Sequence, residues 1–256
     1  MVAGLAFLAT AVATMFAEAT FKRWRQKRSA HEAAWTAALS LFALASAALA
    51  TGASTGWDRG VFRVFYLLGA VLNVPWLALG TVFLLFGEQT GRRVRSVLLF
   101  LSGLAAGVIL AAPIHGDVSG LTIPVGKEVF GVFPRVLAAV GSGLGAIVVF
   151  GGAAWSAVRF ARAARRGAPV PQRAGGPSPG QMAGANALIA AGTLVLSGGG
   201  LVQGIVGHDE AFTLSLAMGI TVIYTGFLVA ARSSRRVPAD GRQSPSVGIA
   251  PASATR

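Results

Sequence analysis

The amino-acid sequence predicts an all-α, polytopic membrane protein: a bundle of seven transmembrane helices with the N-terminus outside and the C-terminus in the cytoplasm. Three observations predict this class. The 256-residue chain is 54% hydrophobic and only 12% charged, about half the charged fraction of a soluble protein. Between its charge clusters lie apolar runs of about 20 residues, the length that crosses roughly 30 Å of hydrocarbon. The basic residues also gather in alternate loops, which defines an orientation.

Seven apolar runs follow one another along residues 1–231, the predicted transmembrane domain. Transmembrane strands would be about ten residues long and would alternate polar with apolar residues, so these runs predict helices. Glu18 is the only charged residue inside any of them. The predicted helices are Val2–Phe21, Ala33–Thr51, Val64–Phe86, Ser96–Ile114, Val136–Val158, Met182–Val206 and Ala211–Ala231.

The first run is predicted to be a retained helix. A signal peptide carries its positive charge before the apolar region, whereas here the basic segment Lys22–Arg28 follows it. Glu18, as an acid inside a span, is a functional candidate. It also precedes Lys22 by four residues, a spacing that forms a favourable helical ion pair, and this pairing is the favoured interpretation.

The third run carries the most informative pattern. Tyr66, Asn73 and Trp76 recur at helical spacing and are predicted to share one face. Pro75 has no N–H, so it frees the carbonyl of Val71 and favours a kink. The functional interpretation is a polar ligand-binding face at mid-membrane. The alternative, which we favour, is packing between helices, because Asn promotes helix association in lipid.

The last two runs supply further candidates for the same ligand face. Gln203 and Tyr224 would complete it from the sixth and seventh helices. Small residues spaced four apart allow close approach of helix backbones, and packing inside the bundle is favoured over a dimer interface. Such pairs are Gly103 with Gly107, Gly141 with Gly145, and Gly200 with Gly204.

The loops determine the orientation. All but four of the 22 Lys and Arg residues lie in alternate loops and in the tail, which are therefore predicted to be cytoplasmic. This charge predicts contact with anionic lipid headgroups, not with nucleic acid. Residues 165–181 and 232–256, rich in Pro, Gly, Ser and Arg, are expected to be a flexible cytoplasmic linker and a disordered tail. The four Lys and Arg residues outside the predicted cytoplasmic segments are Arg59, Arg63, Lys127 and Arg135.

The external loops hold only weak candidates for a metal site, namely His115, Asp117, His208 and Asp209. Their spacing matches no common metal motif, and Asp209 also suits the N-terminus of the last helix. The apolar residues of the long loop His115–Arg135 predict that it folds back onto the helix ends. No cofactor is expected: the chain has no Cys, and no Lys in a span could hold retinal.

One segment carries a resemblance. Tyr66–Thr81 (YLLGAVLNVPWLALGT), with the Ala-rich helices and Arg-rich loops, resembles uncharacterised multi-pass membrane proteins of the actinobacterial type. The resemblance implies a bacterial plasma-membrane protein and no particular activity.

Three functions remain open from the sequence. The leading hypothesis is a non-enzymatic sensory, regulatory or scaffolding protein that acts with a protein partner or as a homo-oligomer, because no catalytic set of residues is present. A carrier for a small solute or lipid, using the polar face of the third, sixth and seventh helices, is the alternative. A membrane enzyme with an external metal site ranks last.

Overall fold

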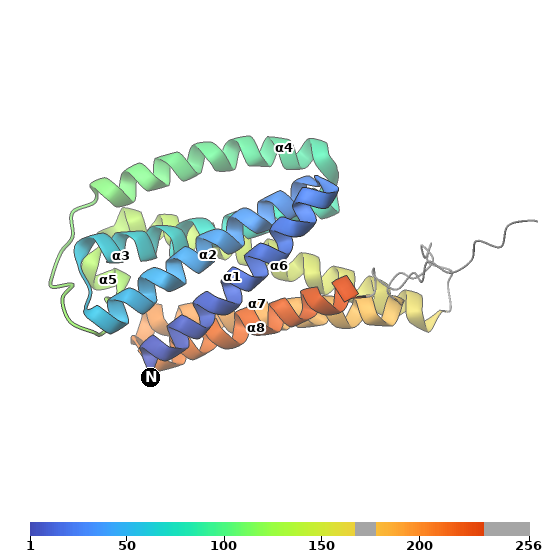
Figure 1. Ribbon diagram of the computed structural model, residues 1–256. Helices are drawn as coiled ribbons and strands as arrows, with labels where there is room; N and C mark the ends of the chain where they lie inside the picture. Colours follow the sequence, from blue (N-terminus) through green and yellow to red (C-terminus); the bar gives the residue numbers. More distant parts are fainter. Residues whose placement is uncertain (167–177, 233–256) are drawn as a thin grey trace, which may run out of the picture.

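Helices make up all the regular secondary structure of the residues that the computed structural model describes, 1–166 and 178–232 (Figure 1). No strand occurs among these residues. The elements, in chain order, are α1 (Val2–Lys27), α2 (Ala30–Thr55), α3 (Arg59–Phe65), the π-helical η1 (Tyr66–Leu72), α4 (Asn73–Ala111), α5 (Gly126–Val129), α6 (Val132–Arg165), α7 (Pro179–Val206) and α8 (Asp209–Arg232).

Six helical stretches in the described part of the chain are long and apolar enough to cross a membrane. The prediction of an all-α membrane protein is therefore confirmed at the level of class. Four of the stretches each contain one predicted span, and a fifth, Pro179–Gln203, contains most of the predicted span Met182–Val206. The sixth, Arg59–Ala111, holds two, because the predicted spans Val64–Phe86 and Ser96–Ile114 fall within or largely within it.

The chain doubles back at Gly87, inside α4. Gly87 has φ 81° and ψ 179°, which is not helical. The indole Nε1 of Trp76 donates to the Ser102 hydroxyl at 3.2 Å, although a straight helix would separate these residues by about 39 Å. Arg63 likewise donates to the carbonyl of Ala112 at 2.7 Å. Residues 73–86 and 88–111 are therefore two antiparallel arms of a hairpin, and the second arm runs along the top of Figure 1.

The helices extend beyond the apolar runs that predicted them. Polar residues at the membrane edges continue the helical hydrogen bonding, so α1 runs to Lys27 and α6 to Arg165. The expected linker 165–181 is shorter than predicted, because Ser178 caps α7 with its hydroxyl and Gln181 completes a capping box. The rest of the linker and the tail lie outside the described residues.

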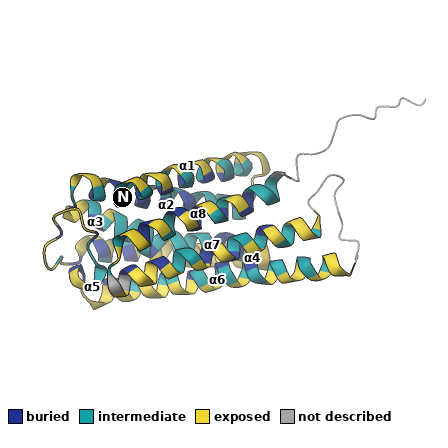
Figure 2. Cartoon of the chain, turned by 90° about the horizontal axis from the view of Figure 1, so that it is seen from below, coloured by how far each residue is buried: buried dark blue, intermediate teal, exposed yellow. Residues whose placement is uncertain are grey.

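Six helical segments form a closed ring. Each packs against the next in the order α1, α2, first arm of α4, α6, α7 and α8, and α8 returns to α1. Two close contacts place the first arm in the ring, since its Gly80 faces Trp35 of α2 and its Val74 faces Gly145 of α6. The second arm, 88–111, packs outside on the first, and most of its residues are exposed. Figure 2 shows the bundle from the side opposite this arm, coloured by burial.

An aromatic cluster fills the end of the ring at which the chain begins. Phe62 is fully buried and stacks on Phe130 with ring centroids 5.5 Å apart. The long loop reaches this end, where Ile123 is buried and its N–H donates to Asp209 at 2.8 Å. The prediction that the loop folds back onto the helix ends is confirmed.

The π-helical segment η1 lies beside this cluster. The N–H of Asn73 reaches back five residues, to the carbonyl of Leu68. Pro75 has no N–H to give to the carbonyls one turn before it. The sequence predicted that Pro75 frees the carbonyl of Val71. In the structure, the Ser142 hydroxyl of α6 donates to the carbonyl of Ala70, one residue earlier, so a neighbouring helix provides a donor at this break.

Candidate functional site

The ring encloses a cavity in the half away from the aromatic cluster. Its empty volume is about 680 Å³, a figure that includes the open space at its mouth. Two lining residues, Leu84 and Leu85, are exposed on the surface, so the cavity opens beside them. The wall consists of Phe16, Thr20, Trp35, Leu39, Leu77, Thr81, Leu84, Leu85, Val149, Gly152, Ala153, Ser156, Asn186, Ile189, Thr193, Ile223 and Phe227.

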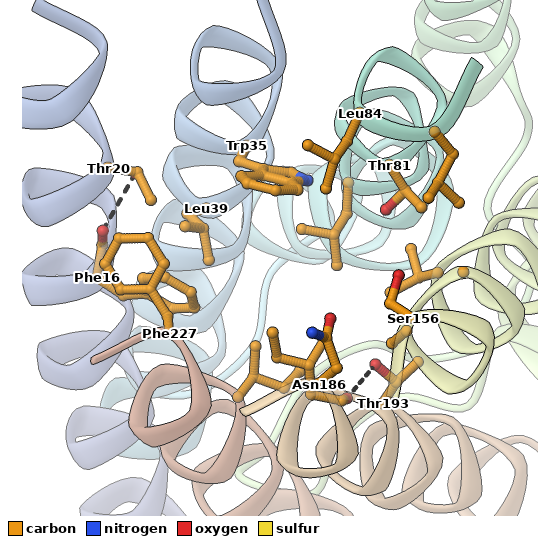
Figure 3. Close-up of a pocket in the computed structure, with 17 residues that line it drawn as sticks. Phe16, Thr20, Trp35, Leu39, Thr81, Leu84, Ser156, Asn186, Thr193 and Phe227 are labelled. Carbon is orange, nitrogen blue, oxygen red and sulfur yellow. Dashed lines mark hydrogen bonds between the residues drawn. The ribbon is translucent and has the colours of Figure 1, made fainter. Parts of the chain in front are cut away.

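Five polar side chains of the wall lie near the same end of the bundle, and Figure 3 shows them around the cavity, with Thr193 as a further polar wall residue. Each stands one to three turns from the end of its helix, and all five ends lie on the same side of the bundle, at the right of Figure 1. Each comes from a different member of the ring. The five residues, which we call the polar belt, are Thr20, Trp35, Thr81, Ser156 and Asn186.

The polar belt has unused hydrogen-bonding capacity. Thr20 donates to its own helix, at 2.9 Å from the carbonyl of Ala17, and Asn186 donates its amide N–H to Met182 at 2.8 Å. Within the described residues, the Trp35 indole N–H and the Thr81 and Ser156 hydroxyls have no hydrogen-bond partner in the protein. A molecule in the cavity would therefore meet one indole donor, two hydroxyls and the Asn186 amide oxygen among apolar side chains.

Close helix contacts give the wall its shape. A Cβ on Gly80 would lie 2.2 Å from the Trp35 ring, and a Cβ on Gly152 would lie 2.6 Å from Thr81. Only glycine fits at either position without displacing these side chains. The two glycines therefore allow Trp35 and Thr81 to occupy their places in the polar belt.

None of the predicted ligand-binding residues lines this cavity. Tyr66 packs on Phe130 with ring centroids 4.9 Å apart, and Trp76 is held by Ser102. Asn73 is half-buried and, like the other two, is not part of the cavity wall. The wide turns of η1 explain the difference, because each extra residue in a turn rotates the remainder of the helix by about 100°.

The candidates from the last two helices are also engaged elsewhere. Gln203 donates to Asp209 at 3.0 Å, at the end with the aromatic cluster. Tyr224 stacks near Phe16 with ring centroids 5.0 Å apart, behind the cavity wall. The glycine pairs spaced four residues apart differ in their surroundings. Gly141 and Gly145 approach the start of α4, whereas Gly103 and Gly107 face away from the described chain. Those last two glycines lie on the second arm, whose outer face has no helix beside it.

The acid inside the first span forms the ion pair that its spacing predicts. Glu18 Oε1 lies 2.6 Å from Lys22 Nζ, and both side chains are exposed. This geometry confirms the helical pairing.

The weak metal candidates have other partners. Asp117 accepts hydrogen bonds from the Ser119 N–H and hydroxyl, which hold the pKa of its carboxyl below the ordinary value. Asp209 accepts from Ile123 and Gln203. No three His, Asp or Glu side chains within residues 1–166 and 178–232 gather in a way that would hold a metal ion, so His115 and His208 do not assemble a site with these acids.

A buried carboxylate lies outside every site that the sequence predicted. Glu32 is fully buried, and its Oε1 accepts from Arg23 Nε at 2.8 Å, with His31 Nε2 4.0 Å away. Its Oε2 has no hydrogen-bond partner among the described residues. One sequence pattern indicates that Glu32 belongs to a helix. Ser29 precedes Glu32 by three residues directly before an apolar run, and this pattern marks a helix start. The predicted span began one residue later, at Ala33, and so left Glu32 in a loop.

The ion pair lies directly behind the cavity wall. The Arg23 guanidinium carbon sits 4.8 Å from the centroid of the Phe227 ring, and Phe227 lines the cavity. Along the chain, Arg23 follows Thr20 by one helical turn and Glu32 precedes Trp35 by one turn.

Comparisons of the chain with protein-family models, curated proteins and solved structures give no match.

Proposed function

We propose that this integral membrane protein binds a small amphipathic molecule in the ring cavity, in a sensory or regulatory role without catalysis. The observation that carries the proposal is the polar belt: three of its side chains, those of Trp35, Thr81 and Ser156, have no hydrogen-bond partner among the described residues, and most of the cavity wall is apolar. A few polar groups in an apolar pocket fix the orientation of a ligand whose larger part is hydrophobic.

The chemistry of the wall favours binding over catalysis. None of the described residues that line the cavity has an ionisable side chain. Hydroxyl, amide and indole groups orient a ligand, whereas acid–base catalysis depends on groups that titrate near the working pH.

We further propose that the chain crosses the bilayer seven times, with the cavity in the cytoplasmic half. The hairpin at Gly87 supports the count, because its two arms are antiparallel. The basic helix ends support the orientation: Lys22–Arg28, Arg92–Arg95 and Arg159–Arg166 all belong to the end of the bundle nearest the cavity. Positive charge is retained on the cytoplasmic side, where it also meets anionic lipid headgroups.

A carrier is the second candidate, and one observation favours it. The π-helical segment and Pro75 form a broken helix next to the aromatic cluster that closes the other end of the ring. Broken helices are the elements that carriers move to open a second entrance. Transport would require the Phe62–Phe130 stack to separate.

Binding is tested by photolabelling the protein in lipid nanodiscs with dodecanol that bears an alkyl diazirine. We expect labelled peptides from α2, α6 and α7, and much weaker labelling of the variant Asn186→Leu. Asn73→Leu is the matched control, since Asn73 is a similar half-buried amide outside the cavity wall. Labelling confined to the lipid-facing surface, and equal in all three proteins, would reject the proposal.

The same probe distinguishes the sensory role from the carrier role. Proteoliposomes that bind the probe but do not accelerate its movement across the bilayer support the sensory role. Accelerated movement that is lost in Pro75→Ala supports the carrier.

A further inference from the structure

The neutral polar belt and the Arg23–Glu32 ion pair behind it together indicate the charge of the ligand. We propose that the cavity takes an uncharged amphiphile with a hydroxyl or carbonyl head, and that Glu32 excludes anionic amphiphiles by cancelling the charge of Arg23. This inference rests on the proposed function.

The groups that face the cavity match an uncharged head. The Trp35 indole N–H donates only, the free Asn186 oxygen accepts only, and the Ser156 hydroxyl does both. A hydroxyl head satisfies a donor and an acceptor at once, and a carbonyl head accepts from the indole and a hydroxyl. A charged head would lose its water without gaining a counter-ion, which is costly in an apolar cavity.

Arg23 lies against the outer side of the cavity wall. Its guanidinium lies on the Phe227 ring, whose other neighbours include Phe16 of the same wall. Its side chain is 28% exposed, so water only partly screens its charge. By itself, a cation in this position would attract the head group of an anionic amphiphile through the wall.

Glu32 removes that attraction. Its side chain is fully buried and its Oε1 lies 2.8 Å from Arg23 Nε, so the pair presents no net charge to the cavity. The side chain also faces no solvent in which its own charge would be screened. Burial of a carboxylate costs free energy unless it is paired, and the Arg23 contact makes burial of this one tolerable. We therefore assign to Glu32 a role in specificity in addition to the contact between α1 and α2.

The test compares three photoprobes with the same dodecyl diazirine chain: an alcohol, a sulfonate and a trimethylammonium. The last two keep their charge at every pH. For the unmodified protein in nanodiscs of uncharged lipid, we expect cavity peptides to be labelled by the alcohol at least about tenfold more than by either charged probe. Equal or stronger labelling by the sulfonate would overturn the assignment of an uncharged ligand.

Glu32→Gln keeps a hydrogen-bond acceptor for Arg23 but removes the negative charge. We expect sulfonate labelling of the cavity to rise about tenfold in this variant while alcohol labelling changes little. Glu18→Gln is the matched control, because it removes an exposed acid from the same end of the bundle, and it should leave the preference unchanged. An unchanged preference in Glu32→Gln would overturn the role of Glu32.

A double variant distinguishes an effect of charge from an effect of misfolding. Arg23→Gln with Glu32→Gln has neither charge, and it should restore the preference for the alcohol if charge cancellation is the cause. If sulfonate labelling of the double variant stays as high as in Glu32→Gln, the charge argument fails. Absence of cavity labelling by every probe in the unmodified protein would instead count against the binding function itself, so the two failures are distinguishable.

Discussion

Trp76 and Ser102 are joined by a hydrogen bond of 3.2 Å from the indole Nε1 to the hydroxyl oxygen, although 26 residues separate them in the chain. The bond ties the two arms of the Gly87 hairpin together. The turn at Gly87 divides one apolar stretch of 53 residues, Arg59–Ala111, into two antiparallel segments, each long enough to cross a bilayer. The hydrogen bond also engages a side chain that the sequence placed in a ligand site.

The hairpin leads to a topology that can be measured. The chain contains no Cys, so single-cysteine variants give labelling without background. In intact cells, a membrane-impermeant maleimide should react with Ser119→Cys in the long loop and spare Gln89→Cys at the hairpin and Ser244→Cys in the tail. All three should react in permeabilised cells. Reaction of Gln89→Cys from outside would contradict seven crossings in this orientation.

Gly87 should be sensitive to substitution for a backbone reason alone. Its φ of 81° with ψ of 179° lies in a region that only glycine enters readily, and no neighbouring atom lies where a Cβ would be placed. We expect Gly87→Ala to lower the free energy of unfolding by about 1–3 kcal/mol. Thermal unfolding in detergent measures the loss. Gly103→Ala, at an open helical position, should cause no loss, and equal effects of the two would refute this account.

Gly80 should affect the cavity more than the fold. A Cβ there would overlap the Trp35 ring at 2.2 Å, so Gly80→Ala must push the indole out of the polar belt. We expect several-fold weaker labelling by the alcohol probe, with the protein still folded. Gly107→Ala adds the same methyl group on the outer arm and is the control. Unaltered labelling in Gly80→Ala would show that Trp35 does not contribute to binding.

Asp209 holds the long loop against the junction of α7 and α8. Its carboxylate accepts from the Ile123 N–H at 2.8 Å and from Gln203 at 3.0 Å. Asp209→Ala leaves both donors unpaired, which costs about 1–3 kcal/mol for each buried group. Hydrogen–deuterium exchange should therefore accelerate at Ile123 and its neighbours in the loop. Glu210→Ala, next in the chain, should not change that exchange, since no hydrogen bond to the Glu210 carboxylate occurs in the described residues.

The class of protein, the apolar spans and the basic end of the bundle were predictable because each depends on local composition. The Glu18–Lys22 pair was predictable for the same reason, since both residues lie on one helix. The turn within Arg59–Ala111 was also visible, as a break in apolarity around Gly87. The sequence did not reveal that η1 would rotate Asn73 and Trp76 away from Tyr66. Nor did it reveal that Glu32 would be buried, because its partner Arg23 belongs to another helix.

The sequence by itself determined that the chain carries helices long and apolar enough to cross a membrane, because the cost of placing charge in hydrocarbon is counted residue by residue along one helix. Only the tertiary structure decided which polar residues share a cavity. In lipid, the outer face of a helix is as apolar as its inner face, so the hydrophobic pattern does not show which side faces the ring. That choice depends on contacts between helices, such as Gly80 against Trp35 and Arg23 against Glu32, which join residues of different spans.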